Sequence, residues 1–325
     1  MHFRSLSDLQ RSILGNLHRI PSDVDLIVGI PRSGMLPATM LGLALNIQIA
    51  DLEGFCSGRI MGSGRTRRRN RDLECSAVKH ALIIDDSIDT GGSMAEAREI
   101  VERASLATKV TYAAVYGVSD LDEADLIFEK VRKLRIFEWN VLHHTMLSCA
   151  CVDIDGVLCH DPSPDENDDG EAYINFILTA RPLFTPTKRI ETLVTSRLEK
   201  YRSQTEHWLK ERGIEYDRLI MLDLPDAATR RRMGAHGSFK GQYYKSQPHS
   251  RLFIESELGQ AREIARISGK PVLCMDGPVM CYPNYLTPRG FRQRARQSNR
   301  IRRFAQRFFG PRLYQAVVGR FGRRS

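Results

Sequence analysis

The segment of residues 81–93 constrains the fold of this chain more than any other feature. An apolar run, residues 81–84, ends in two carboxylates, Asp85 and Asp86, and a glycine-rich turn then leads into a helical pattern. Open parallel sheets bind ligands at the carboxyl ends of their strands, and glycine-rich turns at helix N-termini favour phosphate. The segment therefore predicts a parallel α/β sheet that binds a phosphorylated sugar, whose diol the carboxylates can bind. For the short glycine motif alone, an ordinary turn with an acidic helix cap is the alternative.

Apolar runs alternate with helical patterns in two successive series along the 325 residues. At about 100–200 residues per domain, this length predicts two domains, and the alternation predicts parallel sheets covered on both faces. We expect an α/β fold with two Rossmann-like domains, residues 1–144 and 145–285, and a tail, residues 286–325. The expected strands are 24–30, 47–51, 81–84, 109–115, 147–152, 191–194, 218–222, 251–254 and 271–274, and the expected helices are 5–19, 35–45, 93–104, 198–212 and 257–268.

The net charge of +9 is concentrated in the tail. Leu286 to Ser325 contain twelve Arg, no Lys and no acidic residue, so the rest of the chain has a net charge of −3. The overall charge is therefore no argument for nucleic-acid binding. Apolar residues share one helical face of the tail, and basic amphipathic helices bind anionic membrane surfaces. RNA binding and docking onto the protein itself are the alternatives.

No apolar run approaches the roughly 20 residues that span a bilayer. The first residues also lack the apolar core of a signal peptide. We therefore expect a cytoplasmic protein that associates with the inner face of the membrane through its tail.

Residues 83–93 closely resemble the signature of type I phosphoribosyltransferases, which use phosphoribosyl pyrophosphate (PRPP), and residues 28–34 are similar to the pyrophosphate loop of that family. The arginines of residues 57–72 stand where the family has a flexible loop over PRPP, with a solvated charge run as the alternative. Trp139 stands where purine-salvaging members contact the base, with interdomain packing as the alternative. The resemblance implies that Asp85 and Asp86 hold the ribose hydroxyls directly or through Mg²⁺, that Asp89, Thr90, Gly91, Gly92 and Ser93 cradle the 5-phosphate, and that Arg32, Ser33 and Gly34 bind pyrophosphate.

A second acidic motif follows the apolar run of residues 147–152. Asp153 and Asp155 are two residues apart, so their side chains point to the same side of the chain. Phosphoryl transfer through an enzyme carboxylate needs a nucleophile, a separate proton donor and a metal that neutralises charge. The motif resembles motif one of haloacid-dehalogenase-like (HAD) phosphatases, which implies that Asp153 is the nucleophile and Asp155 the acid and then the base. A turn-type or calcium-binding Asp cluster is the alternative.

The other HAD motifs are assigned by the same resemblance. Thr195 stands at the phosphate-binding hydroxyl, and Lys245 fits the charge-stabilising lysine, with Lys240 as a weaker alternative. Glu255 and Glu257 stand where the family often has paired Asp. Either can join Asp153 and Asp155 at Mg²⁺, which prefers such oxygen ligands, or cap the next helix. The short insert between the first two motifs implies a small cap over the site.

The two resemblances together imply two consecutive reactions. The first attaches ribosyl 5-phosphate from PRPP to an acceptor, and the second removes the 5-phosphate. A glycan hydroxyl, on a lipid-linked glycan that would explain the tail, fits this order, and the arrangement resembles bacterial fusion proteins that place ribofuranose in surface polysaccharides. The alternatives are an enzyme of nucleobase or nucleotide metabolism, in which Trp139 stacks on a base, and a non-catalytic PRPP sensor that binds RNA. Asp89 is a candidate general base for the acceptor.

Overall fold

The computed structural model describes residues 1–62, 74–118 and 124–283. The chain divides into two compact units, Met1–Val141 and Leu142–Ser325. The units thus separate three residues before the expected limit at residue 144. Arginines 65–71 of the predicted loop and the tail, residues 286–325, lie outside the described residues.

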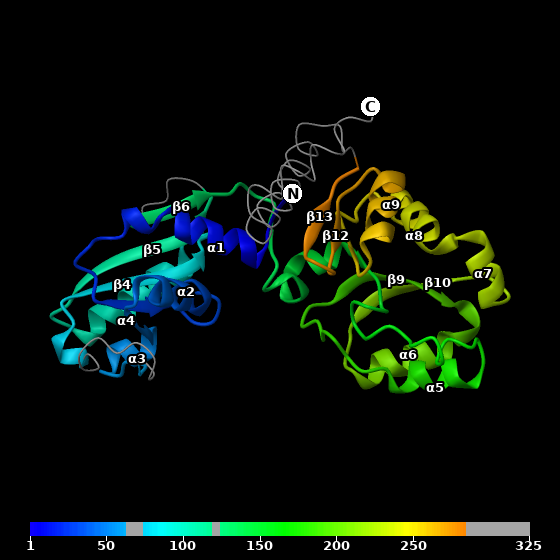
Figure 1. The fold of residues 1–325 in the computed structure, drawn as a ribbon, viewed down its shortest axis with the longest axis horizontal. Coiled ribbons are helices and arrows are strands. Elements are labelled where there is room, and N and C mark those ends of the chain that lie inside the picture. The colour runs from blue at the N-terminus through cyan, green and yellow to red at the C-terminus, as the bar shows by residue number, and fades with distance from the viewer. Residues whose placement is uncertain (63–73, 119–123, 284–325) are drawn as a thin grey trace, which may run out of the picture. The chain divides into compact units, whose positions relative to one another are not determined.

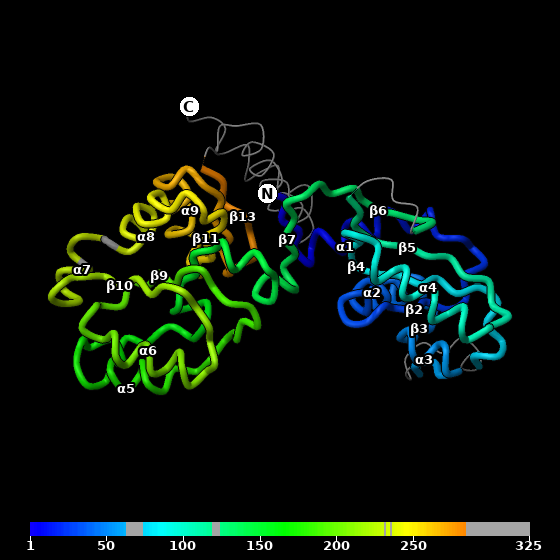
Figure 2. The backbone as a smooth tube through the Cα atoms, turned by 180° about the vertical axis from the view of Figure 1, so that it is seen from behind, coloured from blue at the N-terminus to red at the C-terminus, as the bar shows by residue number. Residues whose placement is uncertain are grey.

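A parallel sheet forms the centre of the first unit. Its strands lie in the order β3-β2-β4-β5-β6 (Figures 1 and 2), and a separate parallel pair joins β1 to β7. The strands are β1 (His2–Arg4), β2 (Leu26–Gly29), β3 (Gln48–Asp51), β4 (His80–Ser87), β5 (Lys109–Gly117), β6 (Leu126–Lys130) and β7 (Arg135–Phe137). The helices are α1 (Leu6–Gly15), α2 (Met35–Leu45), α3 (Leu52–Cys56) and α4 (Gly92–Ala104), with 3₁₀ turns η1 (Leu17–Arg19), η2 (Cys75–Ala77) and η3 (Val141–His143).

Both faces of this sheet are covered by helices. Successive residues of a strand point to opposite faces, so one strand contributes to two apolar clusters. Val28 of β2 packs in one apolar cluster with Phe55 of α3 and Met94 of α4. Its neighbour Ile27 packs in the other cluster, with Leu9 of α1 and residues of α2. This two-sided burial explains why the predicted strands read as continuous apolar runs.

The second unit contains a larger sheet in the order β10-β9-β8-β11-β12-β13, in which only β13 is antiparallel to its neighbour. Its strands are β8 (Ala150–Val152), β9 (Ile190–Leu198), β10 (Tyr216–Leu222), β11 (Leu252–Glu255), β12 (Val272–Cys274) and β13 (Val279–Cys281). The helices are α5 (Glu171–Thr179), α6 (Arg202–Glu211), α7 (Ala227–Met233), α8 (Ala235–Ser246) and α9 (Leu258–Ser268), with η4 (Thr145–Cys149) and η5 (Glu199–Tyr201).

Helices cover the second sheet from both sides. Figures 1 and 2 show α8 and α9 on one side of β9 and β10, and α5 and α6 on the other. Phe253 of β11 packs with Tyr244 of α8 and Ile264 of α9. On the α5–α6 side, the buried Trp208 donates from Nε1 to the carbonyl oxygen of Ala180 at 2.9 Å. Because the strands from β8 to β12 are parallel, their carboxyl ends lie at one common edge of the sheet.

The sequence missed several elements of weak apolar periodicity. Helix α5 lies at the end of the polar insert, and α7 and α8 carry many basic and small residues. Strands β1, β6, β7 and β13 are short and lie in separate pairs or at sheet edges. Because a short edge strand is covered less completely than a central one, its sequence pattern is weaker.

Candidate functional site

Two buried carboxylates mark the end of β4 in the first unit. Asp85 and Asp86 are 7% and 4% exposed. Ser33 Oγ donates to Asp86 Oδ1 at 2.7 Å, and Trp139 Nε1 donates to Asp86 Oδ2 at 2.7 Å. The loop after β2 and the segment after β7 are thus both tied to the end of β4.

In this carboxylate pair, Asp85 is the group whose pKa is raised. Burial and the adjacent charge of Asp86 raise the pKa of Asp85 to about 8. Its Oδ1 accepts a hydrogen bond from the backbone N–H of Asp86 at 2.8 Å. A divalent cation or sugar hydroxyl groups would relieve the repulsion between the two charges. The donor set therefore fits the predicted contact with a ribose diol or its bound Mg²⁺.

The loop after β2 approaches the end of β4 so closely that it needs glycine. A Cβ on Gly34 would lie 2.5 Å from the Ile30 carbonyl oxygen and 2.7 Å from that of Ile84. The Pro31–Arg32 peptide bond is cis. Arg32 is exposed, and its neighbour Ser33 makes the contact with Asp86 described above. The predicted pyrophosphate loop is thus held beside the predicted ribose site.

The glycine-rich turn opens α4. Gly91 has a φ of 84°, which favours glycine, and α4 begins at Gly92. Thr90, Gly92 and Ser93 are exposed. The first N–H groups of a helix lack partners within the helix and attract anions. The turn can therefore receive a phosphate as predicted.

Two cations near this turn were not found from the sequence. Lys133 Nζ lies 3.2 Å and Arg135 Nη2 lies 3.5 Å from Asp89 Oδ1. Arg135 is buried and also donates to the carbonyl oxygen of Ile88, whereas its Nη1 has no hydrogen-bond partner among the described residues. Burial lowers the pKa of Arg135, and Asp89 and Asp86 oppose this effect. Both cations come from the β6–β7 region, whose sequence carries no recognisable motif.

Trp139 belongs to an aromatic stack within its own unit. Its ring lies 4.9 Å from that of Phe137 and nearly parallel to it, and Phe137 stacks on Tyr116 at 5.3 Å. Together with the hydrogen bond to Asp86, the stack fixes the indole. These contacts lie within the first unit, and base stacking and interdomain packing both stay predictions.

A buried lysine joins two carboxylates at the common strand edge of the second unit. Lys240 Nζ lies 2.6 Å from Asp153 Oδ2 and 2.9 Å from Glu255 Oε2. Its third contact is Gln260 Oε1 at 3.2 Å. Asp153 follows β8, Glu255 ends β11 and Lys240 lies on α8. Two neighbouring strands and one covering helix therefore assemble the cluster.

The structure corrects the preferred lysine. Lys245 is exposed in the last turn of α8. Five residues advance a helix by about 140° beyond a full turn, so Lys240 and Lys245 face different directions. The weaker alternative, Lys240, is the lysine beside Asp153. Spacing from the next strand misled the assignment because α8 had not been predicted as a helix.

The cluster carries one more negative than positive charge. Burial raises the pKa of Asp153 well above its usual range, although Lys240 acts against this effect. Burial by itself would lower the pKa of Lys240, but Asp153 and Glu255 raise it above its usual value. The ammonium is therefore firmly protonated beside the two carboxylates.

Asp155 has a separate cationic partner. Arg197, which is fully buried, approaches it with Nη2 at 2.6 Å from Oδ1 and Nε at 3.1 Å from Oδ2. Burial would raise the pKa of Asp155, but Arg197 lowers it below its usual value. Asp155 is therefore ionised in this arrangement. The pairing of Arg197 with Asp155 depends on the third dimension, because the two residues lie on different elements far apart in the sequence.

The four carboxylates expected at Mg²⁺ do not gather in this arrangement. Glu257 caps α9 and accepts from the N–H groups of Gly259 at 2.6 Å and Gln260 at 2.7 Å. Within residues 1–62, 74–118 and 124–283, no three His, Cys, Asp or Glu side chains form a group that could hold a metal ion. The structure thus resolves the choice left open by the sequence: Glu257 is the cap, and Glu255 is the acidic residue beside Asp153.

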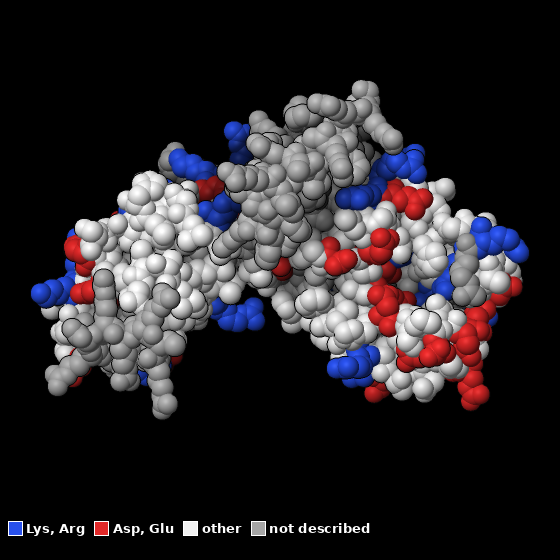
Figure 3. Space-filling view, in the orientation of Figure 1, with Lys and Arg blue, Asp and Glu red and all other residues white. Residues whose placement is uncertain are grey.

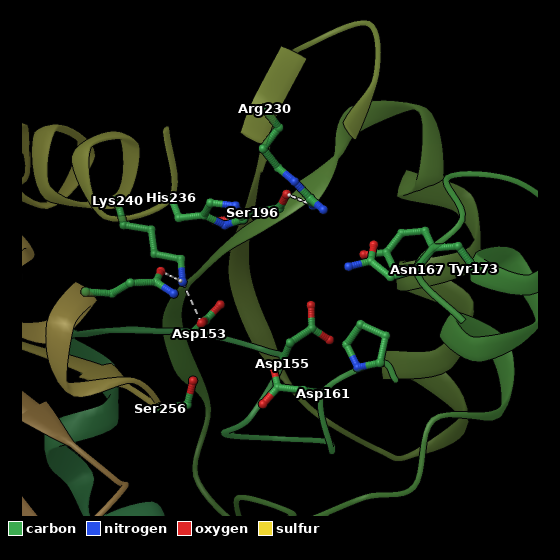
Figure 4. Close-up of a pocket in the computed structure, with 12 residues that line it drawn as sticks. Asp153, Asp155, Asp161, Asn167, Tyr173, Ser196, Arg230, His236, Lys240 and Ser256 are labelled. Atoms are coloured by element: carbon green, nitrogen blue, oxygen red, sulfur yellow. Dashed lines mark hydrogen bonds and ion pairs between the residues drawn. The ribbon is translucent and has the colours of Figure 1, made fainter. Parts of the chain in front are cut away.

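Asp153, Asp155 and Lys240 line a cavity of about 160 Å³. Figure 4 shows Lys240 reaching Asp153, with Arg230 and Asn167 pointing into the cavity from opposite walls. Arg230 is 6% exposed, and its Nε lacks a partner among the described residues, as does the Oγ of the neighbouring wall residue Ser196. Unpaired buried donors are costly, so both favour an oxyanion in the cavity.

Thr195, the expected phosphate-binding hydroxyl, is fully buried. Its Oγ1 accepts from the backbone N–H of Arg197 at 3.2 Å. It is not among the residues that line the cavity, whereas the next residue, Ser196, is. The hydroxyl that faces the cavity is therefore one position further along β9 than expected.

Comparison with known proteins assigns the first unit. Residues 5–144 match the family model of the phosphoribosyl transferase domain. The first unit is a phosphoribosyltransferase domain. Among solved structures, a xanthine-guanine-hypoxanthine phosphoribosyltransferase from Helicobacter pylori is 15% identical over 43% of this chain and 92% of its own, with a TM-score of 0.33. A purine phosphoribosyltransferase from Pyrococcus horikoshii is 21% identical over 42% and 92%, with a TM-score of 0.31.

A chain of the Pnkp1/Rnl/Hen1 RNA repair complex is 13% identical over 77% of this chain and 94% of its own, with a TM-score of 0.28. The family match covers almost all of the first unit and ends at residue 144, three residues into the second unit.

Proposed function

We propose that the chain transfers ribosyl 5-phosphate from PRPP to a glycan hydroxyl and then hydrolyses the 5-phosphate, which leaves ribofuranose on the acceptor. The phosphoribosyltransferase domain supports the first step. The second step rests on one observation. A buried lysine bridges the carboxylate after β8 and the one that ends β11 beside a cavity with unpaired donors.

In the transfer step, the bond from ribose C1 to pyrophosphate breaks and a bond from C1 to the acceptor oxygen forms. Arg32 supplies positive charge to the departing pyrophosphate. The turn from Asp89 to Ser93 holds the 5-phosphate, and Asp89 takes the acceptor proton. Phosphoribosyltransferases generally use Mg²⁺ when they bind PRPP, and its charge would offset that of pyrophosphate and of Asp85 and Asp86.

In the hydrolytic step, a carboxylate oxygen of Asp153 attacks phosphorus and the bond to ribose O5 breaks. Asp155 gives the leaving oxygen its proton and later takes one from the water that splits the aspartyl phosphate. Arg197 prepares Asp155 to act as the base, because it keeps the carboxylate ionised. A bound phosphate dianion would raise the pKa of Asp155 and favour the first role. Lys240 and Arg230 neutralise phosphate charge.

The order of the two steps favours a glycan as the acceptor. Removal of the phosphate makes the transfer effectively irreversible, which suits a finished polysaccharide unit. In nucleotide salvage it would discard the charged group that retains the product. A lipid-linked glycan and binding of the tail to the membrane surface complete the proposal. No described helix is both long and apolar enough to cross a membrane.

The visible face of the described residues carries mixed charge. Figure 3 shows Asp and Glu side chains interspersed with Lys and Arg on the visible face of the described residues. Nucleic-acid sites usually carry a continuous basic patch or stripe. The visible face has no such patch among its described residues.

Product analysis by mass spectrometry tests the proposal. Wild-type protein with PRPP, Mg²⁺ and glycan acceptors is expected to form a ribosylated product and pyrophosphate. Asp153→Asn is expected to accumulate the adduct that retains the 5-phosphate, whereas Asp165→Asn, at an exposed position outside the cavity, is expected to behave as wild type. Phosphate-free product from Asp153→Asn would rule out the sequential scheme.

A further inference from the structure

A second cavity, of about 340 Å³, adjoins the one that holds Asp153. The two share Asp161 and Ser256 as wall residues. Its volume lies within the range of about 300–1,000 Å³ that is usual for ligand pockets. A phosphate ester whose phosphate lies beside Asp153 can therefore extend its organic part past the shared residues into this second cavity.

The walls of the second cavity do not suit another phosphate. Of the described residues that line it, none is Lys or Arg, and three, Asp161, Glu257 and Asp276, are acidic. Like charges close together repel strongly where water is partly excluded. Carboxylates accept hydrogen bonds from hydroxyl groups, so this lining favours a neutral group that is rich in hydroxyls.

Another part of the wall is apolar. Leu183 and Phe184 line it and are 38% and 44% exposed. The backbone beside Phe184 is held: the N–H of Leu183 donates to the carbonyl oxygen of Leu158 at 2.9 Å, and Pro182 pairs with Cys159. An exposed aromatic ring in a cavity wall can pack against the apolar face of a sugar ring.

We propose that this second cavity binds the glycosyl residue to which ribose 5-phosphate has been attached. This inference rests on the proposed phosphatase activity and adds the site that binds the acceptor sugar. The 5-phosphate lies in the first cavity, the ribose lies beside Asp161 and Ser256, and the acceptor sugar packs on Phe184 with its hydroxyls toward the carboxylates. The phosphatase thereby distinguishes the transfer product from free ribose 5-phosphate.

Kinetics with two phosphate esters test this assignment. The substrates are ribose 5-phosphate and a methyl hexopyranoside that carries ribofuranosyl 5-phosphate. The variants are Phe184→Ala and the control Leu178→Ala, which is 40% exposed on α5 outside both cavities. Phe184→Ala is expected to lower kcat/KM for the glycoside about tenfold, the usual worth of a lost aromatic contact, and to leave ribose 5-phosphate unchanged. Leu178→Ala is expected to change neither.

Equal losses for both esters, or none, would overturn the assignment, as would a nucleoside 5′-monophosphate that is hydrolysed faster than the glycoside and depends on Phe184. Binding of the phosphate-free ribosyl hexopyranoside to Asp153→Asn, measured by calorimetry, separates this idea from the proposed function. If the additional Phe184→Ala substitution in the Asp153→Asn protein weakens this binding, the assignment of the cavity is supported even if no ester is hydrolysed. Unchanged binding refutes the assignment.

Discussion

Replacement of Lys240 by methionine removes the only positive charge that contacts both Asp153 and Glu255 among the described residues. Methionine has a similar length and no charge, so the change mainly leaves two carboxylates without their partner. Asp153 is 4% exposed and Glu255 is fully buried. Breaking a buried ion pair by removal of one partner costs about 3–5 kcal/mol. We expect a loss of this size in the unfolding free energy of the second unit near neutral pH.

The loss is expected to depend on pH with a definite sign. Burial raises the pKa of Asp153 and Lys240 acts against this effect, so without Lys240 the folded-state pKa of Asp153 lies further above its value in the unfolded chain. The folded variant then binds more protons than the unfolded chain, so its stability falls as pH rises through the raised pKa of Asp153. The loss relative to wild type is therefore smaller at about pH 5 than at about pH 8.

Amide hydrogen exchange measures this loss in the second unit separately from the first. Peptides that contain β8 and β11 report on the strands beside the cluster, and peptides that contain β4 provide an internal reference in the first unit. Lys245→Met is the matched control, because Lys245 lies on the same helix and is exposed. Its effect is expected to stay within about 0.5 kcal/mol. Equal effects of the two substitutions, or a loss from Lys240→Met that grows at low pH, would refute the assignment of Lys240 to the cluster.

Other expectations follow from the glycine loop and from Asp155. Gly34→Ala is expected to destabilise the first unit by about 1–3 kcal/mol and to abolish PRPP binding in calorimetry, because the new Cβ would meet two backbone oxygens. Gly15→Ala is the control, since the space around its new Cβ is open. An equal effect of the two substitutions would contradict the argument. Arg197→Lys keeps the charge but not the paired geometry, and we expect at least tenfold slower phosphate release, since Arg and Lys are not equivalent at such sites. Because Arg197 lowers the pKa of Asp155, this pair stabilises the fold above the unfolded-state pKa of Asp155 and less as pH falls through the lowered value. Acid titration of stability is therefore expected to show a smaller loss in Arg197→Lys than in wild type, and identical acid limbs would argue against the pair.

The sequence predicted the central elements because their signals are local. The helix predicted over 35–45 is α2, with the same bounds, and the strand predicted over 251–254 differs from β11 by one residue at each end. Strands buried on both faces form continuous apolar runs, and both predicted acidic motifs stand directly after such runs. Helix α8 was not predicted, because it mixes small, basic and aromatic residues with little periodicity. The lysine assignment was wrong for the same reason.

By itself, the sequence determined that two parallel α/β sheets each end in a pair of carboxylates, since strand patterns and short motifs are written in consecutive residues. Only the tertiary structure decided which distant groups meet those carboxylates: Trp139 and Ser33 at Asp86, Lys240 at Asp153, and Arg197 at Asp155. Such partners come from other strands and helices. Their distances from the carboxylates therefore depend on how whole elements pack, which local sequence spacing does not determine.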